Sequence, residues 1–484
     1  MTWTEIFDYS SRREISYSKR SGLLGERWRD TLSSKAMLPA EKPKIETLPP
    51  GPKARRILER ELEVLSLSVI RRYPLIIRSA LGSFVEDVDG NVYIDFDAGN
   101  GIMILGYQNS DVIEALKDQA EAFISEPCPD LPSAIAVDMA EELIRTFGKG
   151  DPKRIFLCSS RSEAIEASLK VARWFTRNTI LISHLGAFYG ETYGALSLSS
   201  GPKASRRRFG PMVPSIFHVP YPYCYRCPYG TTYPDCAHLC LSLLREQILE
   251  NLIPIEDMAA FILKPILPEG CVIPPEGYFQ RLRRIAEEGG FLLIDDETWT
   301  AGGRTGKWLA LDHWETKAEV VCMASTLTSG IPFGILMTEK SIMDWEPGAH
   351  VCTSGLNSLA CKVALTTMEV LRRERLLVRA NNLGRVLMKR IQEMAQEFPL
   401  IGDVRGKGLM VGIEIVKDRE KKIPGAEEKD LILKRAWKRG LILGSSDLST
   451  ILLTPALNIP DDILERGLTI LEDVLRIGQK DMSP

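Results

Sequence analysis

The sequence predicts an α/β protein with a mostly parallel sheet between helices, and three stretches carry that prediction. An apolar run at residues 291–294 is closed by Asp295 and Asp296, a pattern typical of a buried parallel strand whose carboxyl end faces a site. A glycine-rich loop separates it from a second apolar run at residues 320–323. Residues 154–173 have the pattern of a strand, a turn and a helix. Because 484 residues exceed the usual size of one hydrophobic core, we expect two domains.

The composition argues against several classes of protein. Charge is nearly balanced, with 61 Lys and Arg residues against 64 Asp and Glu residues, so we expect no binding to nucleic acid or to an anionic membrane. No apolar run reaches the roughly 18 residues of a membrane span, and the N-terminus lacks the apolar core of a secretory signal. Ten cysteines in a chain of this length do not suggest a disulfide framework. We therefore expect a cytoplasmic protein.

The N-terminal part of the chain has three recognisable segments. Residues 1–41 are polar and rich in basic residues, which predicts an arm that either extends over the surface or is exchanged between subunits. A stretch punctuated by prolines leads into residues 54–65, whose apolar positions have helical spacing. Residues 84–96 alternate around Asp89-Gly90, the strongest signal of a β-hairpin in the chain.

A capping box marks the start of the helix within residues 154–173. Ser160 precedes a run with helical apolar spacing, and Glu163 follows three residues later. A helix N-terminus after a turn of small residues favours an anion, because free N–H groups and the helix dipole both attract negative charge. We therefore expect a phosphate-binding turn at Ser160, Arg161 and Ser162.

Two further stretches carry a resemblance to a known family. The Asp296-Glu297 pair leads into TAGGRTGK at residues 300–307, which resembles the T-G-F-G-R-T-G-K loop of class III aminotransferases. Residues 401–416 resemble a signature of the C-terminal domain of the same family, which uses pyridoxal phosphate (PLP) and includes ornithine and 4-aminobutyrate aminotransferases. The resemblance spans about residues 42–475. It implies PLP-transferase fold type I, with a sheet of the seven-stranded type, and a homodimer.

The resemblance also implies the domain boundaries. A large PLP-type domain is expected at residues 99–360, with a cysteine-rich insert at residues 221–240. A small α+β domain is expected from both chain ends, at residues 42–98 and 361–484.

The family's catalytic lysine is missing from this sequence. In the family, the lysine that bonds the PLP aldehyde lies seven residues before the proline of a G-G-G-x-P-x-G turn. Counting back from Pro332 gives Ser325. A serine hydroxyl cannot form the Schiff base that the lysine forms, and it is a poor base near neutral pH. Because general acid–base help alone contributes about 10²–10⁴-fold to a rate, ordinary transamination is not expected.

Other positions that hold PLP in the family are retained or altered. Asp296 matches the aspartate that keeps the ring nitrogen protonated, and Phe188 matches the aromatic ring that stacks on the pyridine. Arg161 replaces a glycine of the phosphate turn, where it either supplies charge to a phosphate or fills its place. Thr353 matches a threonine that reaches the phosphate of the neighbouring subunit. Trp299 replaces a glutamine near the ring hydroxyl and adds bulk to the pocket.

A lysine stands at an unexpected place in the predicted pocket. Lys264 replaces the glutamate of the family's E-P-I-Q-G segment, and Leu452 replaces the arginine that pairs with that glutamate and can grip a substrate carboxylate. Both members of one ion pair have changed together, as expected when a buried charge without its partner is costly. Lys264 is the only lysine on a motif that faces the pocket, so it is the candidate for a relocated amine.

The cysteine-rich insert predicts a possible metal site. Cys224, Cys227, Cys236 and Cys240 have the spacing C-x2-C-x8-C-x3-C, and four thiols with a tight first pair suit tetrahedral zinc. Buried thiols or labile disulfides are the alternatives. With this insert, the chain looks most similar to archaeal members of the 4-aminobutyrate aminotransferase and amino-acid racemase branch.

Three functional interpretations are open. In the first, which we favour, the chain is a catalytically silent or regulatory subunit, either a homodimer or the partner of an active aminotransferase paralogue to which it lends Thr353. In the second, it is an active PLP-dependent aminotransferase or amino-acid racemase that uses Lys264. In the third, PLP or pyridoxamine phosphate binds without a covalent bond. An amino acid or a phosphate compound is the small-molecule ligand that these interpretations imply.

Overall fold

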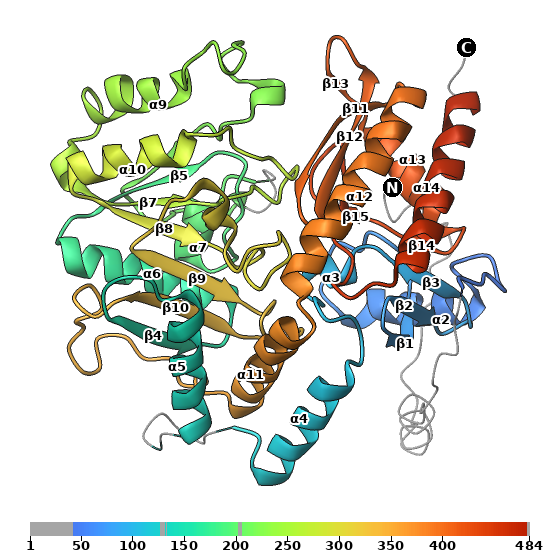
Figure 1. The fold of residues 1–484 in the computed structure, drawn as a ribbon, viewed down its shortest axis with the longest axis horizontal. Coiled ribbons are helices and arrows are strands. Elements are labelled where there is room, and N and C mark those ends of the chain that lie inside the picture. The colour runs from blue at the N-terminus through green and yellow to red at the C-terminus, as the bar shows by residue number, and fades with distance from the viewer. Residues whose placement is uncertain (1–41, 126–130, 132, 202–205, 482–484) are drawn as a thin grey trace.

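A seven-stranded sheet forms the centre of the large domain in this computed structural model, which describes residues 42–125, 131, 133–201 and 206–481 (Figure 1). The strands lie in the order β4-β10-β9-β8-β7-β5-β6. β10 is antiparallel to both neighbours, whereas β9, β8, β7, β5 and β6 run parallel. This confirms the predicted α/β class. Their bounds are β4 (Lys153–Cys158), β5 (Ile180–His184), β6 (Ile216–Val219), β7 (Met258–Leu263), β8 (Leu292–Asp296), β9 (Val320–Ala324) and β10 (Gly334–Glu339).

Helices cover both faces of this sheet. α6 (Arg161–Thr176) shares an apolar cluster with Ile262 and Ile294 on one face. α10 (Tyr278–Gly289) packs on the opposite face, against the side chains of Phe261 and Leu293. That second layer continues over β9 and β10 with α5 (Ala134–Phe147) and α11 (Ser358–Arg373).

The alternation of β8 sends its two terminal carboxylates to different faces. Leu293 belongs to the α10 cluster and Ile294 belongs to the α6 cluster. Because successive residues of a strand point to opposite faces, Asp295 lies on the α10 face and Asp296 lies on the α6 face. The two neighbouring acids therefore belong to two different sites.

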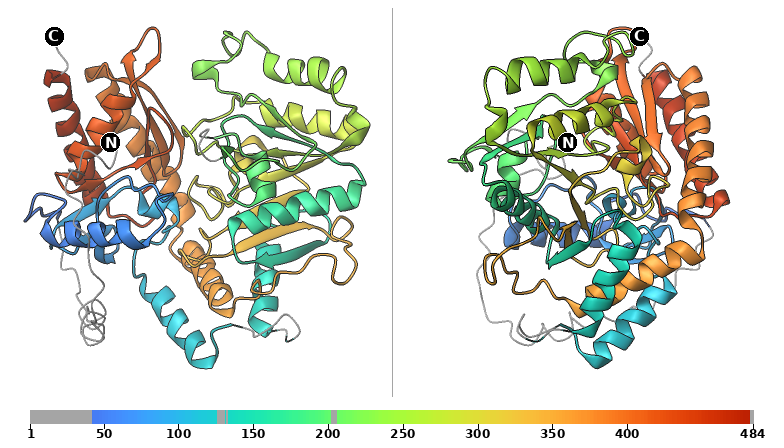
Figure 2. Two further views of the ribbon diagram at one scale, coloured as in Figure 1. Left: turned by 180° about the vertical axis from the view of Figure 1, so that it is seen from behind. Right: turned by 60° about the vertical axis from the view of Figure 1, so that its left-hand side comes forward.

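The smaller part of the molecule lies beside the large domain and combines both ends of the chain (Figures 1 and 2). One sheet has the order β1-β2-β3-β14, in which C-terminal β14 pairs parallel with N-terminal β3. The other has the order β11-β12-β16-β15, with β13 paired to β12. Their bounds are β1 (Ile77–Leu81), β2 (Phe84–Asp87), β3 (Val92–Asp95), β11 (Ile401–Lys407), β12 (Met410–Asp418), β13 (Ile423–Pro424), β14 (Leu441–Ile442), β15 (Gly444–Ser445) and β16 (Thr450–Leu453).

The remaining helices connect or cover these sheets. None of the helices in the described ranges is long and apolar enough to cross a membrane. Their bounds are α2 (Pro52–Val64), α3 (Ala98–Gly101), α4 (Ser110–Ala122), α7 (Tyr193–Leu198), α9 (Leu239–Leu243), α12 (Leu376–Glu397), α13 (Ala426–Trp437) and α14 (Asp461–Asp481), with short 3-10 or π segments at Cys224–Arg226, Leu244–Leu249, Ile255–Asp257 and Ala310–Trp314.

The local predictions for the N-terminal half are confirmed where the structure describes them. β2 and β3 form the antiparallel hairpin around Gly90, whose φ of 91° suits a residue without Cβ. α2 covers the predicted helix, and β4 followed by α6 gives the predicted strand, turn and helix. The predicted arm at residues 1–41 lies outside the described residues.

Candidate functional site

The candidate site lies at the carboxyl ends of three neighbouring parallel strands. Asp296 is the last residue of β8, Lys264 directly follows β7, and Ser325 directly follows β9. Because the carboxyl ends of parallel strands meet at one edge, the fold brings these three residues together although they are far apart in sequence.

A buried ion pair occupies the centre of the site. The ammonium of Lys264 lies 2.5 Å from Oδ2 of Asp296, and the two side chains are 2% and 0% exposed. Oδ1 of Asp296 accepts hydrogen bonds from the backbone N–H of Thr298 at 3.0 Å and from its hydroxyl at 2.5 Å. Burial alone would raise the pKa of Asp296, but the cations of Lys264 and Arg161 outweigh it and lower that pKa. Asp296 is therefore an ionised carboxylate whose two oxygens are both engaged.

Two further side chains complete what we call the Lys264–Asp296 cluster. The ammonium of Lys264 lies 4.8 Å from the centroid of the Tyr189 ring, within cation–π range. Glu269 interacts electrostatically with Lys264, and its Oε2 is buried without a hydrogen-bond partner in the described part of the chain. Burial raises the pKa of Glu269, against the lowering effect of Lys264. The cluster thus contains a carboxyl oxygen, Oε2 of Glu269, that receives no hydrogen bond from the described residues.

Arg161 covers the aromatic ring that the sequence assigns to cofactor stacking. Its guanidinium carbon lies 5.0 Å from the centroid of the Phe188 ring. The same guanidinium lowers the pKa of Asp296, although its effect is smaller than that of burial and of Lys264. Arg161 therefore lies within reach of both groups that would contact a pyridine ring. Whether Arg161 supplies charge to a phosphate or fills the phosphate's place stays a prediction.

The N-terminus of α6 is capped as the sequence predicts. The hydroxyl of Ser160 accepts a hydrogen bond from the N–H of Glu163 at 3.3 Å, and the Glu163 carboxylate accepts one from Ser159 N–H at 2.7 Å. Ser162 packs so closely on Gly190 that a Cβ at this glycine would lie 2.2 Å from the Ser162 hydroxyl oxygen. Two residues of the predicted phosphate turn, Arg161 and Ser162, therefore lie beside the segment that carries Phe188.

Ser325 closes a turn and presents no amine. Its hydroxyl oxygen accepts a hydrogen bond from the N–H of Phe333 at 3.3 Å. Its carbonyl accepts hydrogen bonds from the N–H groups of Thr328 and Gly330, each at 3.2 Å. The side chain and the carbonyl of Ser325 therefore stabilise the loop that follows β9.

Two other predicted residues, Trp299 and Thr353, form no ion pair or hydrogen bond with the Lys264–Asp296 cluster among the described residues. Trp299 packs against an apolar cluster that contains Leu452 and Cys271. Thr353 is exposed on the loop that precedes α11.

A fully buried arginine fixes the glycine-rich loop that follows β8. Arg304 donates hydrogen bonds to the carbonyls of Gly101, Leu409 and Pro455 at 2.8 to 3.2 Å. Burial lowers its pKa to about 10, which leaves it charged at neutral pH. Arg304 therefore ties this loop to segments near both ends of the chain.

The zinc interpretation of the cysteine-rich insert is not supported. Among the residues that the structure describes, no group of three or more His, Cys, Asp or Glu side chains is placed to hold a metal ion. Cys227 lies 3.3 Å from the hydroxyl of Thr231, and His238 Nε2 lies 2.9 Å from the carbonyl of Glu276. All four cysteines of the insert are free thiols, of which Cys224 is exposed and Cys227, Cys236 and Cys240 are partly buried.

Comparison with known proteins identifies the family. The model of class III aminotransferases matches residues 68–475. An alanine/serine racemase from Pyrococcus horikoshii is 35% identical over 444 residues, which covers 90% of this chain and 93% of that protein. A leucine/methionine racemase from Thermococcus litoralis is 35% identical over 419 residues, covering 86% and 94%. A solved Bacillus anthracis aminotransferase superposes with a TM-score of 0.81 at 26% identity, covering 88% and 99%. This chain belongs to the class III aminotransferase family.

That family suggests PLP as the cofactor, but the residues of this chain do not fit PLP as the family holds it. Lys264 already bonds the carboxylate that would hold the ring nitrogen, and Arg161 already covers a face of Phe188. Ser325 has no amine for the aldehyde. Lys264 cannot replace it from its present position, because the ring nitrogen and the aldehyde carbon lie at opposite ends of the pyridine ring.

Several residues of the site were missed by sequence reasoning. Tyr189 and Glu269 follow Phe188 and Lys264 closely, but their roles depend on which neighbour the lysine side chain reaches. Strand alternation was the available signal that Asp295 and Asp296 serve different faces.

Proposed function

We propose that this chain is a catalytically silent member of the class III aminotransferase family, which keeps the fold and acts as a partner or regulatory subunit. One observation supports this proposal above the others: the lysine that remains in the site is bonded to Asp296, while the position that needs a lysine carries Ser325. PLP-dependent transfer of an amino group requires an amine that bonds the cofactor and moves a proton at the substrate carbon. In the proposed silent subunit, neither Lys264 nor Ser325 supplies such an amine.

The interpretation with Lys264 as a relocated amine is less well supported. A lysine attacks an aldehyde through a free amine, whereas the Lys264 nitrogen is paired with the Asp296 carboxylate and lies over the face of Tyr189. Its replacement of the family's glutamate is accounted for by a structural role, because it neutralises a carboxylate that would otherwise be buried alone.

The experiment that tests the proposal is an activity assay on the chain purified alone. The wild-type chain is incubated with PLP, with 2-oxoglutarate, and with alanine, serine, leucine or methionine, the amino acids in the names of the two racemases. Both keto-acid release and loss of optical purity are followed. We expect neither above the rate with heat-denatured protein. Turnover near the 10 s⁻¹ that is typical of enzymes would overturn the proposal.

The partner role has its own support and its own test. Apolar side chains are unusually exposed after α2, including Leu67 at 77% and Ile70 at 91%, and exposed apolar patches of this kind mark association surfaces. Thr353 is exposed as well, and is thereby available to a neighbouring subunit. Native mass spectrometry of the pure chain is expected to give a dimer, and a monomer at all concentrations would contradict this part of the proposal.

A further inference from the structure

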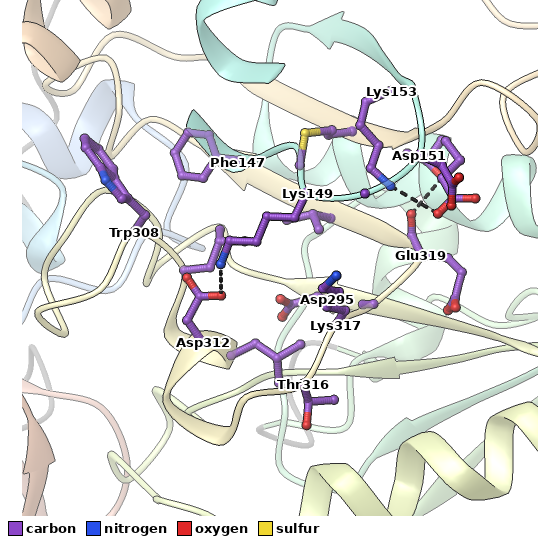
Figure 3. A pocket seen from close by; sticks show the side chains of 18 of the residues that line it. Phe147, Lys149, Asp151, Lys153, Asp295, Trp308, Asp312, Thr316, Lys317 and Glu319 are labelled. Atoms are coloured by element: carbon purple, nitrogen blue, oxygen red, sulfur yellow. Dashed lines mark hydrogen bonds and ion pairs between the residues drawn. The ribbon is translucent and has the colours of Figure 1, made fainter. Parts of the chain in front are cut away.

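Two cavities in the described part of the chain differ in how their charges are balanced. The smaller one, of about 230 Å³, lies beside Asp295 and contains ion pairs such as that of Lys149 with Asp312, 3.0 Å apart (Figure 3). Four cationic and five acidic side chains line it, so its charges nearly cancel. The larger one, of about 490 Å³, lies in the smaller part of the molecule and is lined by four cationic side chains and one acidic side chain. The larger cavity is therefore the one whose charge suits an anion.

Both ends of the chain build the walls of the larger cavity. One wall is formed by residues 70–74, which lead into β1, and the other by one side of α13 together with Ser445 of β15. On α13, the lining residues recur with helical spacing at positions 429, 430, 433, 434 and 437. Because its walls are far apart in the sequence, the cavity exists only in the folded chain. The four cations that line it are Arg71, Arg72, Lys429 and Lys434, and the acid is Asp430.

Two of these cations converge on one residue. The ammonium of Lys429 lies 3.1 Å from the hydroxyl oxygen of Ser445, and the guanidinium of Arg72 donates a hydrogen bond to the carbonyl of Ser445 at 2.5 Å. The Lys429 side chain is only 9% exposed, whereas its acidic partner Asp430, 3.1 Å away, is 56% exposed. Like charges held at one residue repel each other, and a partner in contact with water compensates them weakly. An anion in the cavity is therefore attracted by both cations.

The cations of the cavity keep hydrogen-bond donors for a ligand. Lys434 is half-buried and forms no ion pair with any described residue. Arg71 pairs with Glu61, which does not line the cavity. Arg72 lies 3.5 Å from Asp97, which does not line it either. Because a guanidinium has five N–H donors, each arginine retains several of them, and arginine and lysine are the side chains that proteins use to bind phosphate oxygens.

Apolar side chains form the rest of the wall. Tyr73 and Trp437 pack with their ring centroids 5.8 Å apart, and both line the cavity together with Pro74 and Leu433. Ile70 also lines it and is 91% exposed. A wall of this kind stabilises the apolar part of a ligand by removing it from water. The volume of the cavity lies within the roughly 300–1,000 Å³ of pockets for small molecules.

We propose that this cavity binds a small phosphate monoester with an apolar body. The phosphate pairs with Arg72 and Lys434, with the charge of Lys429 behind them, and the apolar body lies against Tyr73 and Leu433. A phosphate monoester carries about 1.5 to 2 negative charges at pH 7 and three acceptor oxygens, which match the excess of cations better than a carboxylate with one charge does. The cavity lies in the smaller part of the molecule, away from the candidate site of the large domain. The inference therefore does not depend on the proposed function.

Isothermal titration calorimetry on the full chain, in a buffer without phosphate, tests this proposal with phenyl phosphate as the probe. Benzoate keeps the ring but carries a single charge, and inorganic phosphate keeps the charged group without the ring. We expect phenyl phosphate to bind and the other two to bind at least ten-fold more weakly, because benzoate loses a hydrogen bond to a charged group and inorganic phosphate loses the buried ring. Absence of phenyl phosphate binding would overturn the proposal. Benzoate or inorganic phosphate that binds as tightly as phenyl phosphate would overturn it too.

Two variants and a control locate the ligand. Lys434→Gln removes one charge from a half-buried position on α13, and we expect about a ten-fold loss of phenyl phosphate affinity. Arg72→Gln should cause a loss of similar size, and circular dichroism checks that this variant is folded. Lys438→Gln removes the same charge from a half-buried position one helical turn further along that does not line the cavity, and it should bind as the wild type does. Equal affinity of Lys434→Gln and Lys438→Gln would place the ligand elsewhere and refute the assignment.

Discussion

Replacing Lys264 by methionine probes the buried ion pair while keeping the length of the side chain. In the wild type, the Lys264 ammonium and the Asp296 carboxylate are 2.5 Å apart and almost fully buried. Lys264→Met leaves Asp296 with the two hydrogen bonds from Thr298 and with the more distant charge of Arg161. The variant therefore isolates the cost of burying a carboxylate that has lost its main cation.

The structure sets the expected size of this effect. Removing one member of a buried pair costs about 3–5 kcal/mol, because the remaining charge is left uncompensated. The hydrogen bonds from Thr298 remain, so we expect about 3 kcal/mol, the lower end of that range. Asp296→Asn should cost a similar amount, since it leaves the Lys264 ammonium buried. The double variant, Lys264→Met with Asp296→Asn, should recover most of the loss.

Urea unfolding at pH 7 of the wild type, the two single variants and the double variant measures the free energy of unfolding in each. This double-mutant cycle gives the interaction energy of the pair. A coupling of at least about 2 kcal/mol supports the ion pair. Single losses below about 1 kcal/mol that simply add would refute it, and would return Lys264 to the list of candidate catalytic amines.

Three other predictions follow from the same geometry. Arg161→Ala removes the cation–π contact with Phe188 and should lower the free energy of unfolding by about 1 kcal/mol in urea, whereas no change would argue against that contact. Glu297 has a pKa raised by burial from 4.5 to about 7, so the folded state binds more protons than the unfolded state between these values. The free energy of unfolding should therefore fall by about 3 kcal/mol as the pH rises from about 4.5 to 7, and Glu297→Gln should flatten this slope in urea titrations. Cys227, whose pKa is lowered against burial by a hydrogen bond from Thr231, should be alkylated by iodoacetamide before Cys240, whose pKa burial raises to about 11. Peptide mass spectrometry gives that order, and the reverse order would contradict it.

Much of the fold follows from local patterns in the sequence. The hairpin at β2 and β3 is specified by alternation around Asp89-Gly90, and the start of α6 is specified by the capping box of Ser160 and Glu163. These features depend on residues within a few positions of one another. The family motifs at residues 300–307 and 401–416 then supply the arrangement of the domains, which local patterns do not.

The contacts of the candidate site were less predictable for a physical reason. The sequence indicates that Lys264 and Asp296 end neighbouring strands, but the partner of a long lysine side chain depends on rotamers and on neighbouring charges. Arg161 was expected either to serve a phosphate or to take its place, and its contact with Phe188 is set by tertiary packing. The zinc prediction is not supported among the described residues, because the spacing of cysteines in a sequence does not by itself make a metal site.

The three consecutive acids at the end of β8 show the same limit of prediction from sequence. The three consecutive acids at residues 295–297 are evident in the sequence, and strand alternation separates the first two. Which carboxyl group accepts a backbone hydrogen bond depends on the loop that brings Leu311 N–H to Glu297. That loop is fixed by packing of distant segments.

An absorbance titration with PLP tests whether Lys264 and Arg161 occupy the positions from which PLP would contact Asp296 and Phe188. The purified wild-type chain is compared with the variant Lys264→Glu, Arg161→Gly, Ser325→Lys, which introduces the residues that the family resemblance implies at three of the altered positions. We predict that PLP leaves the spectrum of the wild type unchanged and gives the variant the yellow colour of lysine-bound PLP. A wild-type chain that turns yellow on addition of PLP, and loses that colour in Lys264→Ala, would contradict the account.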